Sequence, residues 1–190
     1  MRKISAFNYI SLDGFFAGPN GEIDWFKLNK KDKEFFDYTH RQSKLSNTLI
    51  FGRTTYEMMK SYWPTPDAIK DDPDMAKIMN NSQKIVFSKT LASVQDDSSW
   101  KNIRLFHSIE KDSVVKLKEK ENRDFTILGS GSIIKQFANL DLIDEYQLLI
   151  VPIVLGDGKQ LFKDVKRSNL ELVDSRSFKN GIVSSKYRVV

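Results

Sequence analysis

The sequence predicts an α/β fold: a doubly wound, mostly parallel central sheet flanked by helices, with an antiparallel C-terminal hairpin at one edge. Short apolar runs alternate with helical patterns along most of the chain, as in parallel sheets whose strands are joined by helices. Some runs are continuously apolar, which is typical of strands buried on both faces. Towards the C-terminus, apolar and polar residues alternate on both sides of Asn180-Gly181, and Asn-Gly is the strongest short hairpin signal.

Each element follows from these patterns in chain order. Strands are expected where the runs are short and apolar, at residues 4–10, 48–51, 84–87, 125–128 and 146–151. Helices are expected where apolar side chains recur at helical spacing, at residues 31–45, 54–61, 74–80, 110–121 and 132–140. The hairpin strands are expected at residues 169–178 and 182–190, and loops are densest at 11–24 and 62–73.

Length and charge limit the classes of protein to consider. A chain of 190 residues is long enough for one domain, expected over 1–190. The formal charge is +5, but charges of both signs are interspersed, and no recognition motif or aromatic–basic stripe accompanies them. We therefore expect a small-molecule ligand and no nucleic-acid partner.

The chemistry of the side chains excludes further classes. There is no cysteine, so disulfides, thiolate nucleophiles and cysteine-ligated metals are excluded. The two histidines, His40 and His107, have no carboxylate at metal-ligand spacing, so no metal site is expected, and His107 is interpreted as a strand-end residue. Because no stretch has the length of a membrane span or the apolar core of a signal peptide, we expect no membrane association and a cytoplasmic location.

Three turns, each placed where an apolar run stops, carry small or hydroxylic residues. They are Gly52-Arg53-Thr54-Thr55, Ser88-Lys89-Thr90 and Gly129-Ser130-Gly131-Ser132. A strand that ends in such a turn before a helix directs backbone N–H groups and the positive end of the helix dipole at one point, which suits a phosphate. Any one of these turns is equally well explained as an ordinary helix cap. Three on one sheet predict a dinucleotide site.

The order and spacing of these turns and two further segments resemble a known family. The further segments are Ser11-Leu12-Asp13-Gly14 and the run from Val151 to Gly158. Together they look like the dihydrofolate-reductase-like superfamily, and within it the branch typified by the C-terminal reductase domain of the bifunctional riboflavin-biosynthesis enzyme. The resemblance extends from Lys3 to the final hairpin.

The resemblance implies that the turns bind NADPH. Gly52 would let the chain turn tightly, and Thr54 and Thr55 would cap the next helix while contacting the pyrophosphate. The last helix would also meet the pyrophosphate at its N-terminus, through Gly129, Ser130, Gly131, Ser132 and Ile133. Arg53, with Ser88 and Lys89, would bind the adenosine 2′-phosphate, so two cations favour NADPH over NADH. Ile134 stands where the Gly-x-Gly-x-x-Gly fingerprint has its third glycine, so a standard Rossmann site is disfavoured.

For the substrate, the resemblance points to Asp32. By analogy with dihydrofolate reductases, its carboxylate would accept two N–H bonds from the substrate, although an Asp near a helix start is more often a cap. Trp25, Phe36 and Trp63 are candidates for the pocket lining, with ordinary core packing as the alternative.

The chain departs from both relatives on the substrate side. No arginine lies between Arg53 and Arg104, where dihydrofolate reductases clamp the substrate's glutamate tail, and residues 59–73 lack the Asp-x-Pro-x-Leu-Thr-x-Arg signature of the riboflavin-pathway reductases. The expected function is therefore hydride transfer from NADPH to a C=N or C=O group of a small heterocyclic or carbonyl compound, resembling 5-amino-6-(5-phosphoribosylamino)uracil reductase. The alternatives are dihydrofolate reduction and a catalytically silent nucleotide-binding domain. Such relatives are often dimers, so a homodimer is expected through the 151–155 run and the edge hairpin.

Overall fold

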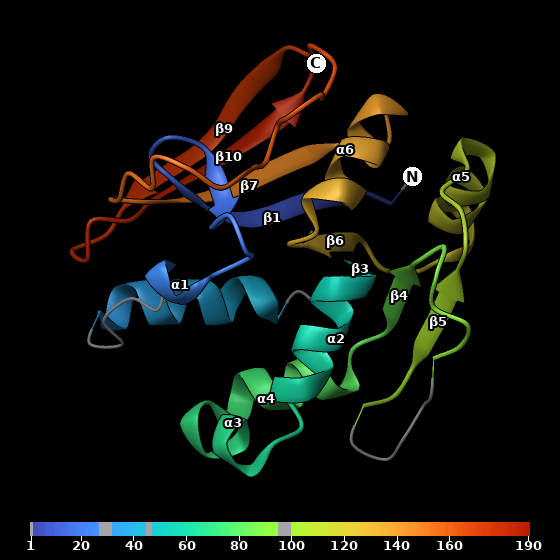
Figure 1. Ribbon diagram of the computed structural model, residues 1–190, viewed down its shortest axis with the longest axis horizontal. Coiled ribbons are helices and arrows are strands. Elements are labelled where there is room, and N and C mark those ends of the chain that lie inside the picture. The colour runs from blue at the N-terminus through green and yellow to red at the C-terminus, as the bar shows by residue number, and fades with distance from the viewer. Residues whose placement is uncertain (1, 27–31, 45–46, 95–99) are drawn as a thin grey trace.

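The computed structural model describes residues 2–26, 32–44, 47–94 and 100–190, and its main sheet has eight strands in the order β5-β4-β3-β6-β1-β7-β10-β9. Strands β5 to β7 run parallel to one another, whereas β10 pairs antiparallel with β7 and forms an antiparallel hairpin with β9 at one edge (Figure 1). The predicted fold class is confirmed. The strands are β1 (Ile4–Ser11), β3 (Thr48–Gly52), β4 (Lys84–Phe87), β5 (Ile103–Phe106), β6 (Phe125–Leu128), β7 (Glu145–Val151), β9 (Leu170–Ser177) and β10 (Val183–Val189).

Helices cover both faces of this sheet (Figure 1). One face carries α5 (Lys111–Lys120) and α6 (Gly131–Asn139); the other carries α1 (Lys33–Ser43), α2 (Arg53–Tyr62) and α4 (Pro73–Asn81). Three short elements complete the fold: α3 (Pro66–Asp71), the 3-10 helix η1 (Asp24–Phe26), and a small sheet of β2 (Phe15–Ala17) with β8 (Lys159–Gln160). None of the helices in the described ranges has the length and apolar character needed to cross a membrane.

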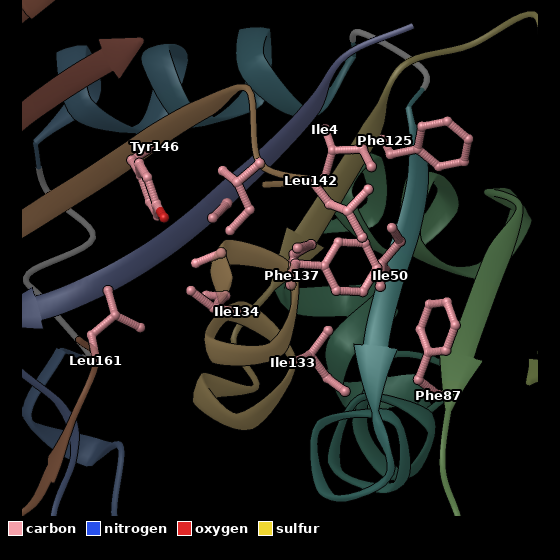
Figure 2. Packing of buried hydrophobic residues seen from close by; sticks show 14 of the residues in the cluster. Ile4, Ile50, Phe87, Phe125, Ile133, Ile134, Phe137, Leu142, Tyr146 and Leu161 are labelled. Atoms are coloured by element: carbon pink, nitrogen blue, oxygen red, sulfur yellow. The ribbon is translucent and has the colours of Figure 1, made fainter. Parts of the chain in front are cut away.

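Strand β1 shows how alternation along a strand builds both faces. Ile4 and Ala6 join the cluster beneath α5 and α6, whereas Phe7 and Tyr9 pack with the cluster beneath α1. Because successive strand side chains point to opposite faces, a central strand covered by helices must be apolar on both. Figure 2 shows Phe137 of α6 directed towards the sheet, among the side chains of the first cluster.

The structure differs from the sequence prediction in several elements. Residues 62–73, expected to be a loop, contain the helix α3, because Thr65 caps it by accepting a bond from the Ala68 backbone N–H and Pro66 occupies its first turn. The run from Ile103 to Phe106 forms the edge strand β5. The helix expected at 31–45 begins at Lys33 and ends at Ser43, and both predicted termini, residues 31 and 45, lie outside the described residues.

Candidate active site

A cavity of about 1300 Å³ lies against the sheet, where the parallel strands β3, β4, β5 and β6 end and α2 and α6 begin. The chain passes outward from β3 through β4 to β5 and then returns, so that β6 lies between β3 and β1. In open α/β sheets, ligands bind outside the carboxyl ends of the strands, at the point where the strand order reverses. A single small-molecule pocket has about 300–1,000 Å³, so this cavity has room for a cofactor and a substrate together.

Ser130 connects two of the predicted phosphate turns. Its Oγ accepts a hydrogen bond from the Gly52 backbone N–H at 2.8 Å and donates one to Thr55 Oγ1 at 2.7 Å. A Cβ atom added to Gly52 would lie 2.9 Å from that Oγ, so the close approach of the two turns requires glycine at position 52. The ends of β3 and β6 are thereby held as one unit.

The helices that leave these turns begin without a side-chain cap. Gly52 is the N-cap of α2 and Ser130 that of α6, and neither side chain bonds a first-turn N–H group of its own helix. Gly129 and Ser130 both adopt left-handed backbone conformations, with φ of 58°. Two neighbouring helix N-termini whose N–H groups are not capped by side chains form a site suited to two linked phosphates.

Arg53 and Ser88 lie at the predicted adenosine end of the cavity. Arg53 Nε donates to Glu57 at 2.8 Å and its Nη1 donates to Thr90 Oγ1 at 3.0 Å, so the guanidinium is held beside the turn that follows β4. Ser88 Oγ accepts bonds from two backbone N–H groups of the same turn, and its carbonyl contacts His107 Nδ1 at 3.0 Å. His107, interpreted from sequence only as a strand-end residue, therefore also lines the cavity.

All the residues assigned to the cofactor line this one cavity. They are Gly52, Arg53, Thr54, Thr55, Ser88, Lys89, Gly129, Ser130, Gly131, Ser132 and Ile133. They come from three turns far apart in the sequence, and the fold brings them together. What they bind stays a prediction.

Asp32 occupies a different place from the one expected for a substrate ligand. Its Oδ1 accepts a bond from the Phe35 backbone N–H at 3.1 Å, which caps α1, and its Oδ2 accepts one from the Asn180 backbone N–H at 3.0 Å. These bonds, led by the one from Phe35, lower the pKa of the carboxyl below its usual value. Asp32 is not part of the cavity wall. The carboxylate fastens α1 to the turn of the C-terminal hairpin.

Two of the three aromatic residues predicted to line the substrate pocket are in the cavity wall. Phe36 and Trp63 line the cavity, and Trp63 Nε1 lies 3.1 Å from the sulfur of Met59. Trp25 is outside the wall: its Nε1 donates to the Glu22 carbonyl, and its ring meets Phe26 edge-on. Phe26, the next residue, lines the cavity in its place.

Several lining residues had no sequence signal that marked them as functional. Phe7 and Tyr9 alternate with buried residues along β1, a pattern that predicts a strand but gives no reason to expect a cavity above one face. Tyr9 stacks on Phe26 with ring centroids 4.7 Å apart, and burial raises the pKa of its phenol to about 12. The phenol therefore keeps its proton at neutral pH.

A charged group lies elsewhere in the cavity wall. Glu145 at the start of β7 accepts bonds from Lys3 at 2.7 Å and Lys186 at 2.8 Å. Burial alone would raise the pKa of this carboxyl, but the two ammonium groups outweigh burial and lower it. Nearby, Gln147 donates to the hydroxyl of Tyr38, which also bonds Ser184.

Comparison with known proteins agrees with this geometry. The chain is 34% identical over 179 residues to YyaP of Bacillus subtilis, an uncharacterized protein, and the match covers 94% of this chain and 90% of YyaP. A crystal structure from Shewanella sp. PV-4, described provisionally as a riboflavin biosynthesis protein, superposes with a TM-score of 0.74 at 23% identity, covering 100% of this chain and 99% of that one.

Dihydrofolate reductase from Enterococcus faecalis, solved with NADP(H), has the same fold, with a TM-score of 0.66 at 16% identity over 98% of this chain and 96% of that one. The family model described as the RibD C-terminal domain matches residues 2–184. The chain belongs to the RibD C-terminal domain family.

Proposed function

We propose that this protein is an NADPH-dependent reductase that transfers hydride to a C=N or C=O group of a small heterocyclic or carbonyl compound. The observation that carries the proposal is the junction at Ser130, which holds the N-termini of α2 and α6 side by side in one large cavity. A helix N-terminus is a ready-made phosphate site, so two of them side by side suit the two linked phosphates of a dinucleotide. The nicotinamide, when bound, supplies the hydride, and the protein supplies binding and orientation.

Charge at the adenosine end supports NADPH over NADH. Arg53 and Lys89 line the cavity at the ends of β3 and β4, and Arg53 is oriented by Glu57 and Thr90. A site for NADH would more often place a carboxylate on the free 2′-hydroxyl. The related dihydrofolate reductase structure contains NADP(H), which supports the same choice.

The lining disfavours dihydrofolate as the substrate. Within the described part of the wall, Arg53 is the only arginine, and Arg104, the next along the chain, pairs with Glu121 at 2.6 Å instead. A bidentate clamp for a glutamate tail is therefore missing from the described residues, which should weaken dihydrofolate binding about a hundredfold or more. A compact heterocycle, such as the ribosylaminopyrimidine of the riboflavin pathway, fits the aromatic lining better.

Turnover distinguishes the reductase from a catalytically silent nucleotide-binding domain. NADPH oxidation should be followed by absorbance with 7,8-dihydropterin, 5-amino-6-(5-phosphoribosylamino)uracil, dihydrofolate and small carbonyl compounds. We expect turnover of a compact substrate and little or none of dihydrofolate. Tight NADPH binding without oxidation by any compound would favour the silent domain, and efficient reduction of micromolar dihydrofolate would refute the argument from the missing arginine.

We also propose that the chain acts as one domain, in the cytoplasm, as a homodimer. The support for a dimer is the edge strand β9, whose residues are all exposed, including the apolar Leu170, Leu172 and Val173. An exposed apolar edge strand invites pairing with a second copy.

A further inference from the structure

A histidine and an aspartate from separate helices meet in the cavity wall. His40, in α1, is 8% exposed, and its Nε2 lies 2.9 Å from Oδ1 of Asp72, the N-cap of α4. The other ring nitrogen, Nδ1, lies 2.9 Å from the Phe36 backbone carbonyl. Both His40 and Asp72 line the cavity that contains the two helix N-termini.

The partners of His40 suit a ring that donates from both nitrogens. A carbonyl oxygen and a carboxylate oxygen accept hydrogen bonds, so both contacts are satisfied when both ring nitrogens donate. In that arrangement the pair holds one proton more than a neutral imidazole beside a carboxylate. The ring of Phe36 stacks on the imidazole with centroids 3.8 Å apart, and an aromatic face stabilises a cation in that position.

The other charged groups around His40 are consistent with this arrangement. On α1, Asp37 is held mainly by a hydrogen bond from Lys33, and His40 is among the nearby groups that lower the pKa of its carboxyl. Arg41 follows His40 directly on the same helix. From the junction of α3 and α4, the contact is made by Asp72, whose Oδ1 also accepts the Met75 backbone N–H at 3.0 Å.

Other ionisable groups also line the described cavity wall. Tyr9 keeps its proton because burial raises the pKa of the phenol to about 12. Glu145 is ionised between two lysines, and Asp124 accepts the Lys3 backbone N–H at 2.9 Å. His107 lies at the adenosine end, against the Ser88 carbonyl. Lys89, Lys159 and Lys186 also line the wall, with Lys89 at the adenosine end and Lys186 paired with Glu145, and the His40–Asp72 pair is the place where a buried imidazole meets a carboxylate.

We propose that the His40–Asp72 pair donates the proton in the reduction, with Asp72 meeting the substrate and His40 storing the proton. Asp72 is the more exposed member, at 22% of its side chain against 10% for His40. This assignment rests on the proposed reductase function.

The proposed step balances as follows. The C4–H bond of the dihydronicotinamide breaks and a C–H bond forms on the substrate, while the π electrons of C=N or C=O move to the heteroatom. That atom takes a proton from Asp72, which Asp72 receives from Nε2 of His40. The products are NADP⁺, the reduced substrate and a neutral imidazole beside a carboxylate. Solvent reprotonates the pair after the products leave.

Nitrogen-15 NMR of histidine-labelled protein tests the protonation state without any ligand. The chain has only two histidines, so a His107→Gln variant assigns the signals. We expect both nitrogens of His40 to carry protons near neutral pH in the wild type. In Asp72→Asn, the amide oxygen still accepts but cannot balance the charge, so His40 should become neutral. A neutral His40 in the wild type would overturn the proposal.

Kinetics test the use of that proton, with 7,8-dihydropterin and 5-amino-6-(5-phosphoribosylamino)uracil as the probes. Asn is a good N-cap, so Asp72→Asn should preserve α4. The variant should slow single-turnover hydride transfer about a hundredfold or more. The fall in the wild-type rate with rising pH should be absent from the variant. NADPH affinity, measured by titration, should not change. Asp74→Asn, in the first turn of the same helix, is the matched control and should keep the wild-type rate.

The outcomes separate this proposal from the one on which it rests. A wild-type rate and pH profile in Asp72→Asn would overturn the proton-donor role and leave the reductase function intact. If the wild type oxidised NADPH with none of the compounds of the panel, small carbonyl compounds included, the reductase function itself would be overturned, and the donor role would fall with it. The histidine spectrum would then still record whether the pair carries its proton.

Discussion

At the scale of single residues, Ser130 has the largest structural influence on the candidate cofactor site. Its hydroxyl accepts from Gly52 and donates to Thr55, and its own backbone adopts a left-handed conformation that places it at the entrance of α6. A non-glycine residue in this conformation costs free energy, and such strain is often retained at functional sites. The two hydrogen bonds offset this cost and align both helix N-termini.

The first prediction concerns the 2′-phosphate. Arg53→Ala should weaken NADPH binding about tenfold to a hundredfold, because a charge-assisted hydrogen bond contributes roughly 1.5–3 kcal/mol, and should leave NADH binding nearly unchanged. Fluorescence titration with both cofactors measures this. Arg188→Ala, which removes an exposed arginine paired with Glu171 on the hairpin, is the control. An equal loss for NADPH and NADH would contradict the assignment.

A second prediction concerns Gly131, where the structure adds a neighbour that the sequence did not reveal. A Cβ atom there would lie 2.5 Å from the ring of Phe16, so a larger residue must displace that ring as well as narrow the approach of a phosphate. Gly131→Val should lower NADPH affinity at least about tenfold with a modest loss of thermal stability. Phe16→Ala measures the part due to ring displacement. Unchanged NADPH affinity in folded Gly131→Val would remove this turn from the site.

At the scale of elements, strand β4 begins with a lysine that has no exposed surface. The ammonium of Lys84 donates to the backbone carbonyls of Asn80, Ser82 and Lys101, and it lies 4.4 Å from the centre of the Trp100 ring. It therefore joins the C-terminal end of α4, where a cation is favourable, to the segment that leads into β5.

Lys84→Met should lower the free energy of unfolding by at least about 2 kcal/mol, because the carbonyls lose a charged donor in a buried place. Urea denaturation measures the change. The neighbouring exposed Lys101→Met is the matched control and should shift it by less than about 0.5 kcal/mol. Equal small effects would mean that the carbonyls find other partners.

The loop after β1 is joined to the segment after β7 by Asp13. The hydroxyl of Ser11, helped by the backbone N–H groups of Gly156 and Leu155, lowers the pKa of this carboxyl from 3.8 to about 2. A carboxyl whose pKa is lower in the folded state stabilises the fold above its unfolded pKa and loses that contribution as the pH falls.

Asp13→Asn should therefore be less stable than the wild type near neutral pH, and the difference should shrink as the pH falls from 3.8 towards 2. Denaturation midpoints measured over a pH series test this. If the difference in stability between the two proteins stayed constant down to pH 2, the loss in Asp13→Asn would be due to side-chain geometry, and the charge of the carboxylate would not contribute to stability.

The elements that sequence predicts well are those with a strong local pattern. Short, largely apolar runs located β4 and β6, and Asn180-Gly181 located the hairpin. The helix α3 was missed although the Thr65-Pro66 start signal was present, because the surrounding residues form no apolar stripe.

Residues of the candidate site could be predicted from the sequence only where they are neighbours in one turn. Each phosphate turn is contiguous in the sequence, and the residues of the three turns line one cavity, although what they bind stays a prediction. The His40–Asp72 pair joins residues separated by 32 positions, and no local pattern connects them. The position of Asp32 before a helix suits a cap as well as a ligand; in the structure its carboxylate caps α1, and Asp32 is not among the residues that line the cavity.

At the scale of the whole molecule, the sheet has two different edges. Beyond β7 the parallel order ends, and β9 is the outermost strand, with every residue exposed. Leu172 is 54% exposed and Val173 41%, on a strand that has one hydrogen-bonding edge unpaired within the described chain. The candidate cofactor turns follow β3, β4 and β6, which lie on one side of β1 in the strand order, whereas β9 lies on the other. Contact between two copies at β9 would therefore leave the cofactor turns accessible.

The last prediction is that the protein forms a two-fold dimer in which β9 of one copy packs against β9 of the other. Size-exclusion chromatography with light scattering should give twice the chain mass for the wild type. Leu172→Lys should give the monomer, because a charge on an edge strand opposes edge pairing, and NADPH affinity should be unaffected. Glu171→Gln, on the same strand, should remain dimeric. A monomeric wild type at high micromolar concentration would contradict the prediction. A dimer that withstands Leu172→Lys would place the interface elsewhere, with the partly exposed 151–155 segment as the next surface to test.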